Sequence, residues 1–246
     1  MPEPVLILGA TSAIARHVAA SFAARGRPLF LAGRNLSEVE RLAADLRIRH
    51  RVEAVAGQFE AEDYEGHREF LRGVVRRMGD LEGVVVAFGY LGEQGQAEKD
   101  LEETFRVIDR NFTGAVSVLN HCADFFETRR GGFIVAISSV AGDVGRQSNY
   151  LYGAAKGGLN VYLQGLRARL FRAGVRVLTV KPGFVDTPMT FGRPKLFLVA
   201  PPARVGERIA RAAERGGDVV YVPWFWRFIM LALKLTPEGL RKRLKL

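Results

Sequence analysis

Three residues in the middle of the chain have types and spacing that could carry out proton transfer. Tyr152 and Lys156 are four residues apart in Tyr-Gly-Ala-Ala-Lys, so a helix beginning near Tyr150 would place both on one face. A free tyrosine titrates at about 10, and a nearby ammonium lowers that pKa. Ser139 follows a predicted strand, at the edge where open α/β sheets bind ligands. From these residues alone, Tyr152 could instead be core packing and Ser139 a cap.

A second group of residues could bind a nucleotide. The turn after the first predicted strand reads Gly9-Ala10-Thr11-Ser12-Ala13-Ile14-Ala15. Small residues there let backbone amides and a helix N-terminus approach a pyrophosphate, to which Thr11 and Ser12 add hydroxyl donors. The same turn would suit any tight junction between a strand and a helix.

The residue that follows the second predicted strand bears on the choice of nucleotide. Arg34 stands in the region where an NAD site expects Asp or Glu. A guanidinium suits a 2′-phosphate, so NADP(H) is predicted in preference to NAD(H). The alternative is a solvated arginine at the end of a strand.

The elements that must position these residues alternate between apolar runs of strand length and amphipathic helical segments. This rhythm predicts βαβ units and a parallel sheet, and continuous apolar strands predict helices on both of its faces. The expected fold is therefore one α/β domain over residues 1–246, a Rossmann-like doubly wound parallel sheet of about seven strands. The predicted strands are Val5–Leu8, Leu29–Ala32, Val52–Ala56, Val84–Ala87, Phe133–Ile137, Val175–Val180 and Val219–Val222.

Composition excludes several other classes of protein. The chain has 246 residues, of which 48% are hydrophobic and 25% charged, as in globular proteins. The single cysteine, Cys122, excludes a disulfide framework, and the four histidines lack the spacing of metal ligands. Half of the net charge of +10 lies in residues 227–246, which argues against a nucleic-acid-binding face. No segment is long and apolar enough to span a membrane, and we expect a cytoplasmic protein.

Taken together, these motifs resemble those of the short-chain dehydrogenase/reductase (SDR) family over essentially the whole chain. The residues that carry the resemblance are the Gly9 turn, Asn111, Ser139 thirteen residues before Tyr152, Lys156, and the run Pro182-Gly183-Phe184-Val185-Asp186-Thr187. The resemblance implies an NAD(P)-dependent oxidoreductase that reduces a ketone to a secondary alcohol by hydride transfer. It also implies a homo-oligomer, a tetramer or a dimer.

The resemblance assigns a role to each catalytic residue. Tyr152 is expected to protonate the alkoxide, and Ser139 to hydrogen-bond the substrate oxygen. Lys156 is expected to hold the nicotinamide ribose, and Asn111 to support a water that links Lys156 to solvent. The expected cofactor-binding residues are Gly9, Thr11, Ser12, Ala13, Ile14, Arg34, Gln58, Phe59, Ala87, Phe88, Gly89, Tyr152, Lys156, Pro182, Gly183, Val185 and Thr187.

The chain also departs from the family pattern, chiefly where the adenosine would bind. Ala13 and Ala15 replace two glycines of the usual turn, Gln58 stands where an adenine-contacting aspartate is usual, and Ala87-Phe88-Gly89 replaces Asn-Asn-Ala-Gly. These differences change the residues expected to contact the adenosine and leave the reducing end of the family pattern intact.

Within the family the chain most resembles a subgroup that includes the reductase of decaprenylphosphoryl-2-keto-ribose. The resemblance to this subgroup lies in residues 9–15, 87–92 and 146–153 of the chain and in its aromatic, basic tail. The resemblance implies a lipid-linked keto-sugar substrate; the alternatives are a soluble carbonyl or 3-ketoacyl reductase, or a non-catalytic NADP-binding protein docked by its tail. Specificity is expected in loops 90–96, 143–149 and 189–200. Phe191, Leu196 and Phe197 would make the last of these an apolar lid.

The tail, residues 223–246, differs in kind from the rest of the chain. A helix over Pro223–Lys234 would be apolar on nearly its whole circumference, and cations follow it. It predicts peripheral contact with a membrane or a lipid-linked substrate; the alternative is packing on a neighbouring subunit. Thr236-Pro237-Glu238 predicts a fresh helix start, with Thr236 as N-cap and Pro237 at N1. Surplus apolar residues on two long helices also predict subunit contacts; they include Val116, Phe125, Leu159 and Leu163.

Overall fold

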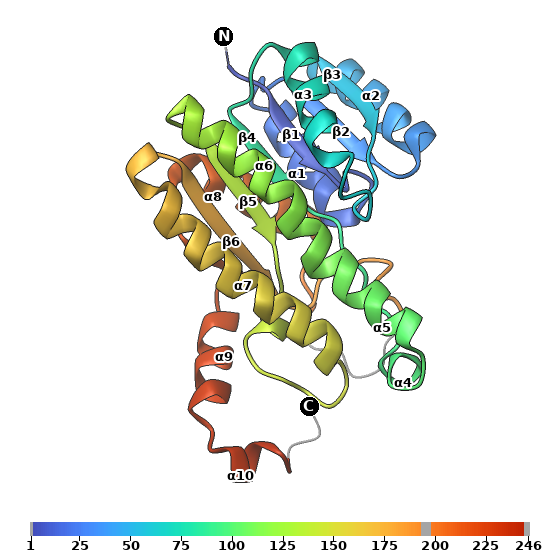
Figure 1. Ribbon diagram of the computed structural model, residues 1–246, viewed down its shortest axis with the longest axis vertical. Coiled ribbons are helices and arrows are strands. Elements are labelled where there is room, and N and C mark those ends of the chain that lie inside the picture. The colour runs from blue at the N-terminus through green and yellow to red at the C-terminus, as the bar shows by residue number, and fades with distance from the viewer. Residues whose placement is uncertain (1, 193–197, 244–246) are drawn as a thin grey trace.

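One seven-stranded parallel sheet forms the centre of the molecule (Figure 1). The computed structural model describes residues 2–192 and 198–243. The strand order is β3-β2-β1-β4-β5-β6-β7, so the predicted doubly wound fold is confirmed. The strands are β1 (Val5–Leu8), β2 (Leu29–Gly33), β3 (Ala54–Gln58), β4 (Gly83–Val86), β5 (Phe133–Ile137), β6 (Arg176–Pro182) and β7 (Val219–Val222).

Helices cover both faces of the sheet, as the continuous apolar strands require. Along β1, Val5 and Ile7 point into one apolar core and Leu6 and Leu8 into the other. Helices α1, α2 and α8 pack on the first core, and α3, α6 and α7 on the second. These helices are α1 (Ala13–Ala23), α2 (Leu36–His50), α3 (His67–Met78), α6 (Gly114–Arg129), α7 (Tyr150–Leu170) and α8 (Pro202–Arg215).

The remaining helices extend the molecule beyond the carboxyl ends of the strands (Figure 1). They are α4 (Gln94–Ala97), α5 (Leu101–Ile108), α9 (Trp226–Leu235) and α10 (Glu238–Arg241). The strand order reverses at β1, which lies between β2 and β4. Loops from the carboxyl ends of these strands diverge to opposite faces there, and open α/β sheets bind their ligands in the crevice that results.

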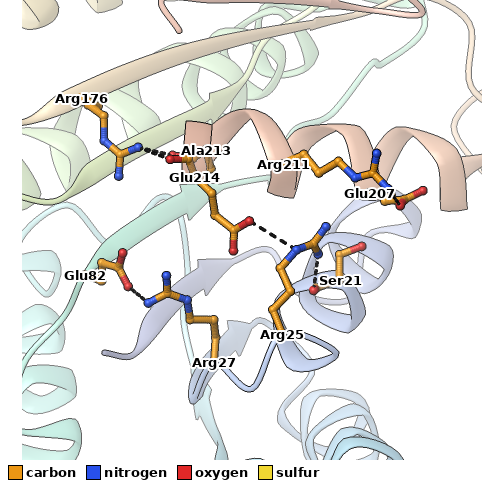
Figure 2. Close-up of polar contacts among 9 residues, drawn as sticks. All are labelled: Ser21, Arg25, Arg27, Glu82, Arg176, Glu207, Arg211, Ala213 and Glu214. Atoms are coloured by element: carbon orange, nitrogen blue, oxygen red, sulfur yellow. Dashed lines mark hydrogen bonds and ion pairs between the residues drawn. The ribbon is translucent and has the colours of Figure 1, made fainter. Parts of the chain in front are cut away.

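Several arginines lie near the amino ends of the strands, on the side of the sheet away from the crevice. They pair with carboxylates or donate hydrogen bonds to the C-terminal end of a helix (Figure 2). Arg25 pairs with Glu214 at 3.3 Å, and Arg27 pairs with Glu82. Arg176 donates hydrogen bonds to the carbonyl oxygens of Ala213 and Glu214, at 2.8 and 2.7 Å, and so satisfies the end of α8. These cations stabilise the fold at this edge, away from the crevice.

The C-terminal segment has one buried face and one exposed face. Trp226 and Met230 of α9 pack on Val140 and Val144, in the loop after β5. The large apolar residues that the segment exposes are Trp224, Phe228, Leu231, Leu235 and Leu240.

Three details of the predicted tail were wrong. The helix begins at Trp226 rather than Pro223. Thr236 ends α9 and donates a hydrogen bond back to the carbonyl of Ala232 instead of capping α10, and Pro237 is the residue that precedes α10. The Lys234 Nζ lies 3.2 Å from the buried carboxylate of Asp143, although 45% of the lysine side chain is exposed. Lys245 lies outside the described residues.

The helices predicted to carry subunit contacts have different exposed residues from those expected. Leu159 and Leu163, on the inner face of α7, are fully buried in this chain's own core. Val116 and Phe125, on α6, are half-buried. The apolar residues that α5 and α7 expose most are Leu101, Phe105 and Val161. The spacing of apolar residues along a helix shows which face is buried. It does not show whether that face packs on this chain's own core or on another subunit.

Candidate active site

A cavity of about 790 Å³ lies over the carboxyl ends of the strands. All of the residues expected to bind the cofactor line it except Gln58, which is exposed at the end of β3. Ser139, Tyr152 and Lys156 also line it, whereas Asn111 lies behind its wall. Residues from the three predicted specificity loops complete the walls, among them Tyr90, Arg146 and Met189. Leu196 and Phe197 of the predicted lid lie outside the described residues, and Phe191 is exposed.

The Gly9 turn forms the end of the cavity nearest β1. Gly9 has φ +75°, and a Cβ there would lie 2.6 Å from the backbone nitrogen of Phe88, so only glycine fits. Ser12 caps α1, and its hydroxyl accepts a hydrogen bond from the amide of Ala15 at 3.2 Å. The N-terminus of α1 therefore points into the cavity with free space above it, which suits a phosphate group.

A cation lies beside this turn, at the end of β2. Arg34 is exposed and lines the cavity. Glu38 lines the same region and pairs with Arg16 at 3.5 Å, so its charge is partly compensated. Asn35 caps α2 by accepting a hydrogen bond from the amide of Glu38. The adenosine end of the cavity thus offers a guanidinium to a phosphate group.

The two serines after β5 have different surroundings. Ser138 is buried and donates a hydrogen bond to the carbonyl of Lys156 at 3.3 Å, which ties β5 to α7. Ser139 caps the short 3₁₀ turn Val140–Gly142, and its hydroxyl accepts a hydrogen bond from the amide of Ala141 at 3.1 Å. Ser139 is therefore both a cap and a cavity residue, so the two interpretations of its sequence position are compatible.

Glycines bring α7 close to that 3₁₀ turn. A Cβ on Gly142 would lie 2.6 Å from the carbonyl carbon of Lys156, and one on Gly153 would lie 2.9 Å from the carbonyl oxygen of Ala141. This close approach holds Tyr152 and Lys156 against the end of β5. The Lys156 Nζ donates a hydrogen bond to the carbonyl of Ile137 at 3.1 Å and lies 5.8 Å from the centre of the Tyr152 ring.

Burial governs the pKa values of the two titratable groups on this wall. It raises the pKa of the Tyr152 hydroxyl to about 12, although a hydrogen bond with Ser139 and the charge of Arg146 act in the opposite direction. It also lowers the pKa of the Lys156 ammonium to about 8. The net direction for Tyr152 is opposite to the one expected from the sequence, because loss of solvent outweighs its neighbours. At neutral pH the Tyr152 hydroxyl is therefore protonated and can donate its proton, and the neighbouring Lys156 carries a positive charge.

Asn111 supports this wall from behind. It lies in a π turn, Asp109–Thr113, between α5 and α6; such turns are frequent at functional sites. Its side-chain amide donates to the carbonyls of Tyr90 and Val107, and its oxygen accepts from the Tyr90 amide at 3.2 Å. A Cβ on Gly89 would lie 2.8 Å from this oxygen and 3.5 Å from the Lys156 Nζ, so Asn111 is close to the lysine.

Two residues at or near the cavity were not assigned to the site from the sequence: Arg146, which lines it, and Trp226, which packs behind its wall. Arg146 belongs to the loop 143–149, which was predicted to affect specificity, but no individual residue in it was assigned. Trp226 lies over the turn after β6, where a Cβ on Gly183 would be only 1.9 Å from its indole nitrogen. No spacing rule identifies either residue, because each reaches the site through a loop or a distant helix.

Two further features are absent from the parts of the chain that the structure describes. Residues 2–192 and 198–243 contain no group of three or more His, Cys, Asp or Glu side chains placed to hold a metal ion. None of their helices is long and apolar enough to cross a membrane.

Comparison with known proteins agrees with this site. The family model for short chain dehydrogenases matches residues 3–195, and the chain belongs to the short-chain dehydrogenase/reductase family. An uncharacterized oxidoreductase of Mycobacterium tuberculosis (strain ATCC 25618 / H37Rv) is 36% identical over 241 residues, which are 98% of this chain and 96% of the relative. One from Streptomyces coelicolor is 36% identical over 244 residues, 99% of this chain and 96% of that protein. The chain is thus an SDR oxidoreductase.

Solved structures show the same fold at lower sequence identity. A variant of actinorhodin polyketide ketoreductase with NADPH superposes with a TM-score of 0.82 at 24% identity, over 92% of this chain and 97% of that one. An alcohol dehydrogenase from the archaeon Thermococcus sibiricus, complexed with 5-hydroxy-NADP, gives 0.79 at 21%, over 90% and 96%.

Proposed function

We propose that the protein reduces a ketone to a secondary alcohol with NADPH, and that Tyr152 is the proton donor. The observation that carries this proposal is the arrangement of one cavity. Ser139, Tyr152 and Lys156 line one end of it, and the Gly9 turn and Arg34 line the other. The Gly9 turn and the N-terminus of α1 fit the pyrophosphate of a dinucleotide. The cavity therefore offers binding residues for both the adenosine end and the nicotinamide end of the cofactor.

Each residue at the reducing end has a part in the proposed reaction. When bound, the nicotinamide would supply the hydride that reduces the carbonyl carbon. Ser139 and Tyr152 then hold the carbonyl oxygen, and Tyr152 transfers its phenolic proton to that oxygen as negative charge develops there. The Lys156 ammonium stabilises the tyrosinate that remains. Asn111 holds the Tyr90 loop through hydrogen bonds to the Tyr90 backbone, and it would support a water that links Lys156 to solvent.

A preference for NADPH is proposed from the residues at the end of β2. Arg34 provides a cation for a 2′-phosphate, and the nearby Glu38 is paired with Arg16. The NADPH in the ketoreductase structure and the 5-hydroxy-NADP in the alcohol dehydrogenase structure agree with this choice.

The proposed substrate class is a lipid-linked keto-sugar, as in the subgroup that the motifs resemble. The exposed face of the C-terminal segment supports it. Phe228, Leu231 and Leu235 are exposed on α9. Arg227, four residues before Leu231, is exposed on the same helix, and Lys242 is exposed just after α10, so the segment exposes aromatic, aliphatic and basic side chains. This is the composition of a peripheral contact with an anionic membrane surface.

The membrane contact is tested with vesicles of anionic phosphatidylglycerol and the full chain. We expect co-sedimentation at low salt, and loss of it in a double variant with Phe228→Ser and Leu231→Ser. Phe171→Ser is the matched control, because Phe171 is also exposed and lies after α7. If the wild type stays in the supernatant, the membrane contact is excluded. If the double variant instead changes the oligomeric mass, this surface packs on a neighbouring subunit.

The reaction is tested by a screen of lipid-linked and soluble ketones with NADPH, followed by absorbance at the reduced nicotinamide band. We expect turnover by the wild type and a loss of two to four orders of magnitude in kcat for Tyr152→Phe, because the general acid is removed. Equal rates for the two proteins would contradict the assignment of Tyr152. Turnover of soluble ketones alone would favour a carbonyl or 3-ketoacyl reductase. No turnover, with NADPH bound, would favour the non-catalytic NADP-binding alternative.

A further inference from the structure

Arg146 is a cation of the cavity wall that lacks a partner within the part of the chain described. Its side chain is largely buried, and its Nε has no hydrogen-bond partner among residues 2–192 and 198–243. It lines the cavity at the end that contains Tyr152, close enough for its charge to act on the pKa of the tyrosine hydroxyl. A desolvated guanidinium without a counter-ion is unfavourable, so it calls for an explanation.

Asn149, in the same loop, has a second buried polar atom without a hydrogen-bond partner among the described residues. The loop is short, and the amide of Asn149 donates a hydrogen bond to the carbonyl of Arg146 at 3.1 Å, so the two residues form one turn. The Asn149 Oδ1 is buried and has no partner among the described residues, and Asn149 also lines the cavity. One turn therefore presents a buried donor that carries charge and a buried acceptor, on the wall that holds the tyrosine.

The carboxylates of the cavity lie elsewhere. Among its described lining residues the carboxylates are Glu38 and Glu60, which follow β2 and β3 at the adenosine end. The other arginine near the middle of the cavity, Arg110, already pairs with Glu62 at 2.5 Å. The cofactor's phosphates have their own partners at the Gly9 turn and Arg34. An anion for Arg146 must therefore come with the substrate.

We propose that Arg146 and Asn149 form a substrate subsite that binds an oxyanion and a neighbouring hydroxyl group. The substrate of this enzyme is thus a hydroxylated ketone that carries a phosphate or a carboxylate near its carbonyl. A guanidinium binds either oxyanion through two parallel N–H donors, and the asparagine oxygen accepts from a hydroxyl. This inference rests on the proposed ketone reduction, and it adds the class of group that the substrate bears beside the reacting carbon.

A competing role for Arg146 is purely electrostatic. Its charge could serve to stabilise the Tyr152 anion, since it lowers the pKa of that hydroxyl. The two roles differ in what they predict for neutral substrates. An electrostatic partner of Tyr152 acts on every ketone alike, whereas an anion subsite distinguishes a charged ketone from a neutral one of the same shape.

The experiment compares pairs of ketones that differ in one anionic group. Dihydroxyacetone phosphate is paired with dihydroxyacetone, and acetoacetate with ethyl acetoacetate, so the two arms separate phosphate from carboxylate. The readout is the ratio of kcat/KM within each pair, for the wild type, Arg146→Gln, Arg146→Lys and Asn149→Ala. Arg110→Gln is the matched control, because Arg110 lines the same cavity but is ion-paired.

We expect the wild type to prefer the anionic member of at least one pair. Arg146→Gln should lower that preference by about 10- to 100-fold, as loss of a charge-assisted hydrogen bond does. Arg146→Lys should retain part of the preference, and Arg110→Gln should keep it in full. Asn149→Ala should raise KM for both hydroxylated ketones with little change in the preference for charge. The inference is overturned if the wild type shows no preference in either pair, or if Arg146→Gln slows both members of a pair equally.

A binding arm keeps this inference separate from the proposed reaction. Inorganic phosphate is titrated by calorimetry into protein saturated with NADP⁺, so that the cofactor's own phosphate sites are filled. Binding to the wild type that is lost in Arg146→Gln supports the subsite even if every ketone of the panel fails. Absence of binding to the wild type overturns it, whether or not ketones are reduced.

Discussion

Asp143 is the buried centre of a polar cluster that joins the active-site loop to the C-terminal helix. Its carboxylate accepts hydrogen bonds from the Lys181 Nζ at 2.5 Å and from the Tyr221 hydroxyl at 2.7 Å, and the Lys234 Nζ lies 3.2 Å away. The side chains of Asp143 and Lys181 are 2% and 8% exposed. Residues from β6, β7 and α9 thus converge on a carboxylate four positions after Ser139.

Asp143→Asn should destabilise the protein strongly, because it leaves the Lys181 ammonium buried without a counter-ion. Loss of one partner from a buried ion pair costs about 3–5 kcal/mol, whereas an exposed pair contributes about 0–1 kcal/mol. For a chain of this size, 1 kcal/mol lowers Tm by about 2–4 °C, so we expect a fall of roughly 6 °C or more. Removing Lys181 as well, in the double variant with Lys181→Met, should restore part of the loss.

The measurement is urea unfolding followed by circular dichroism, with Glu69→Gln as the matched control. Glu69 pairs with Arg76 at 2.7 Å, but their side chains are 62% and 70% exposed, so solvent screens the pair and the control should change the stability little. If Asp143→Asn costs no more than Glu69→Gln, the buried cluster does not stabilise the fold. A double variant no more stable than Asp143→Asn would show that the stranded ammonium is not the cause.

The same carboxylate gives the stability a dependence on pH. Burial raises the pKa of Asp143, but the hydrogen bonds from Lys181 and Tyr221 and the charges of Lys181 and Lys234 outweigh it, so the net shift is downward. A carboxyl group with a lowered pKa in the folded state stabilises that state above its ordinary pKa, and the stabilisation is lost as pH falls through the folded value. The acid limb of the wild-type stability curve should therefore be steeper than that of Asp143→Asn.

Three further predictions follow from the site and the surface. Arg34→Asp should shift cofactor preference toward NADH by at least an order of magnitude in kcat/KM, and equal use of both cofactors by the wild type would refute the role of Arg34. In the cofactor-free protein, the free energy of unfolding should rise between about pH 8 and 10.5, where the unfolded lysine binds a proton that folded Lys156 has lost; urea titrations of Lys156→Met should lack this rise. Light scattering should show an oligomer for the wild type and 27.2 kDa for Val161→Asp, which places a charge on the exposed face of α7; a monomeric wild type would disprove the assembly.

The sheet could be predicted from the sequence because its strands are uninterrupted apolar runs. Val5–Leu8, Phe133–Ile137 and Val219–Val222 were predicted with the bounds that the structure shows. The third strand was placed two residues early, since it begins at Ala54. The preceding helix continues to His50 and ends at Arg51 with φ 55°, and no glycine or proline marks that end in the sequence.

The reducing end of the site could also be predicted, because its spacing is local. Tyr152 and Lys156 lie on one helix that begins at Tyr150, as expected, and Ser139 lies just past the end of β5. What could not be predicted depends on contacts that are distant in the sequence. The pKa of Tyr152 was expected to be lowered, but burial raises it, and burial is a property of the assembled walls.

The tail shows why distant contacts matter most here. Read as a sequence, it is an apolar appendage that could be deleted to test for membrane binding. In the structure, Trp226 fills the space over Gly183 and packs, with Met230, on the loop after Ser139. A deletion would therefore remove side chains that support the cavity wall together with the exposed surface, so a loss of activity could have either cause. Substitutions confined to the exposed face of α9, such as Phe228→Ser, separate the surface from the site, because that face makes no part of the cavity.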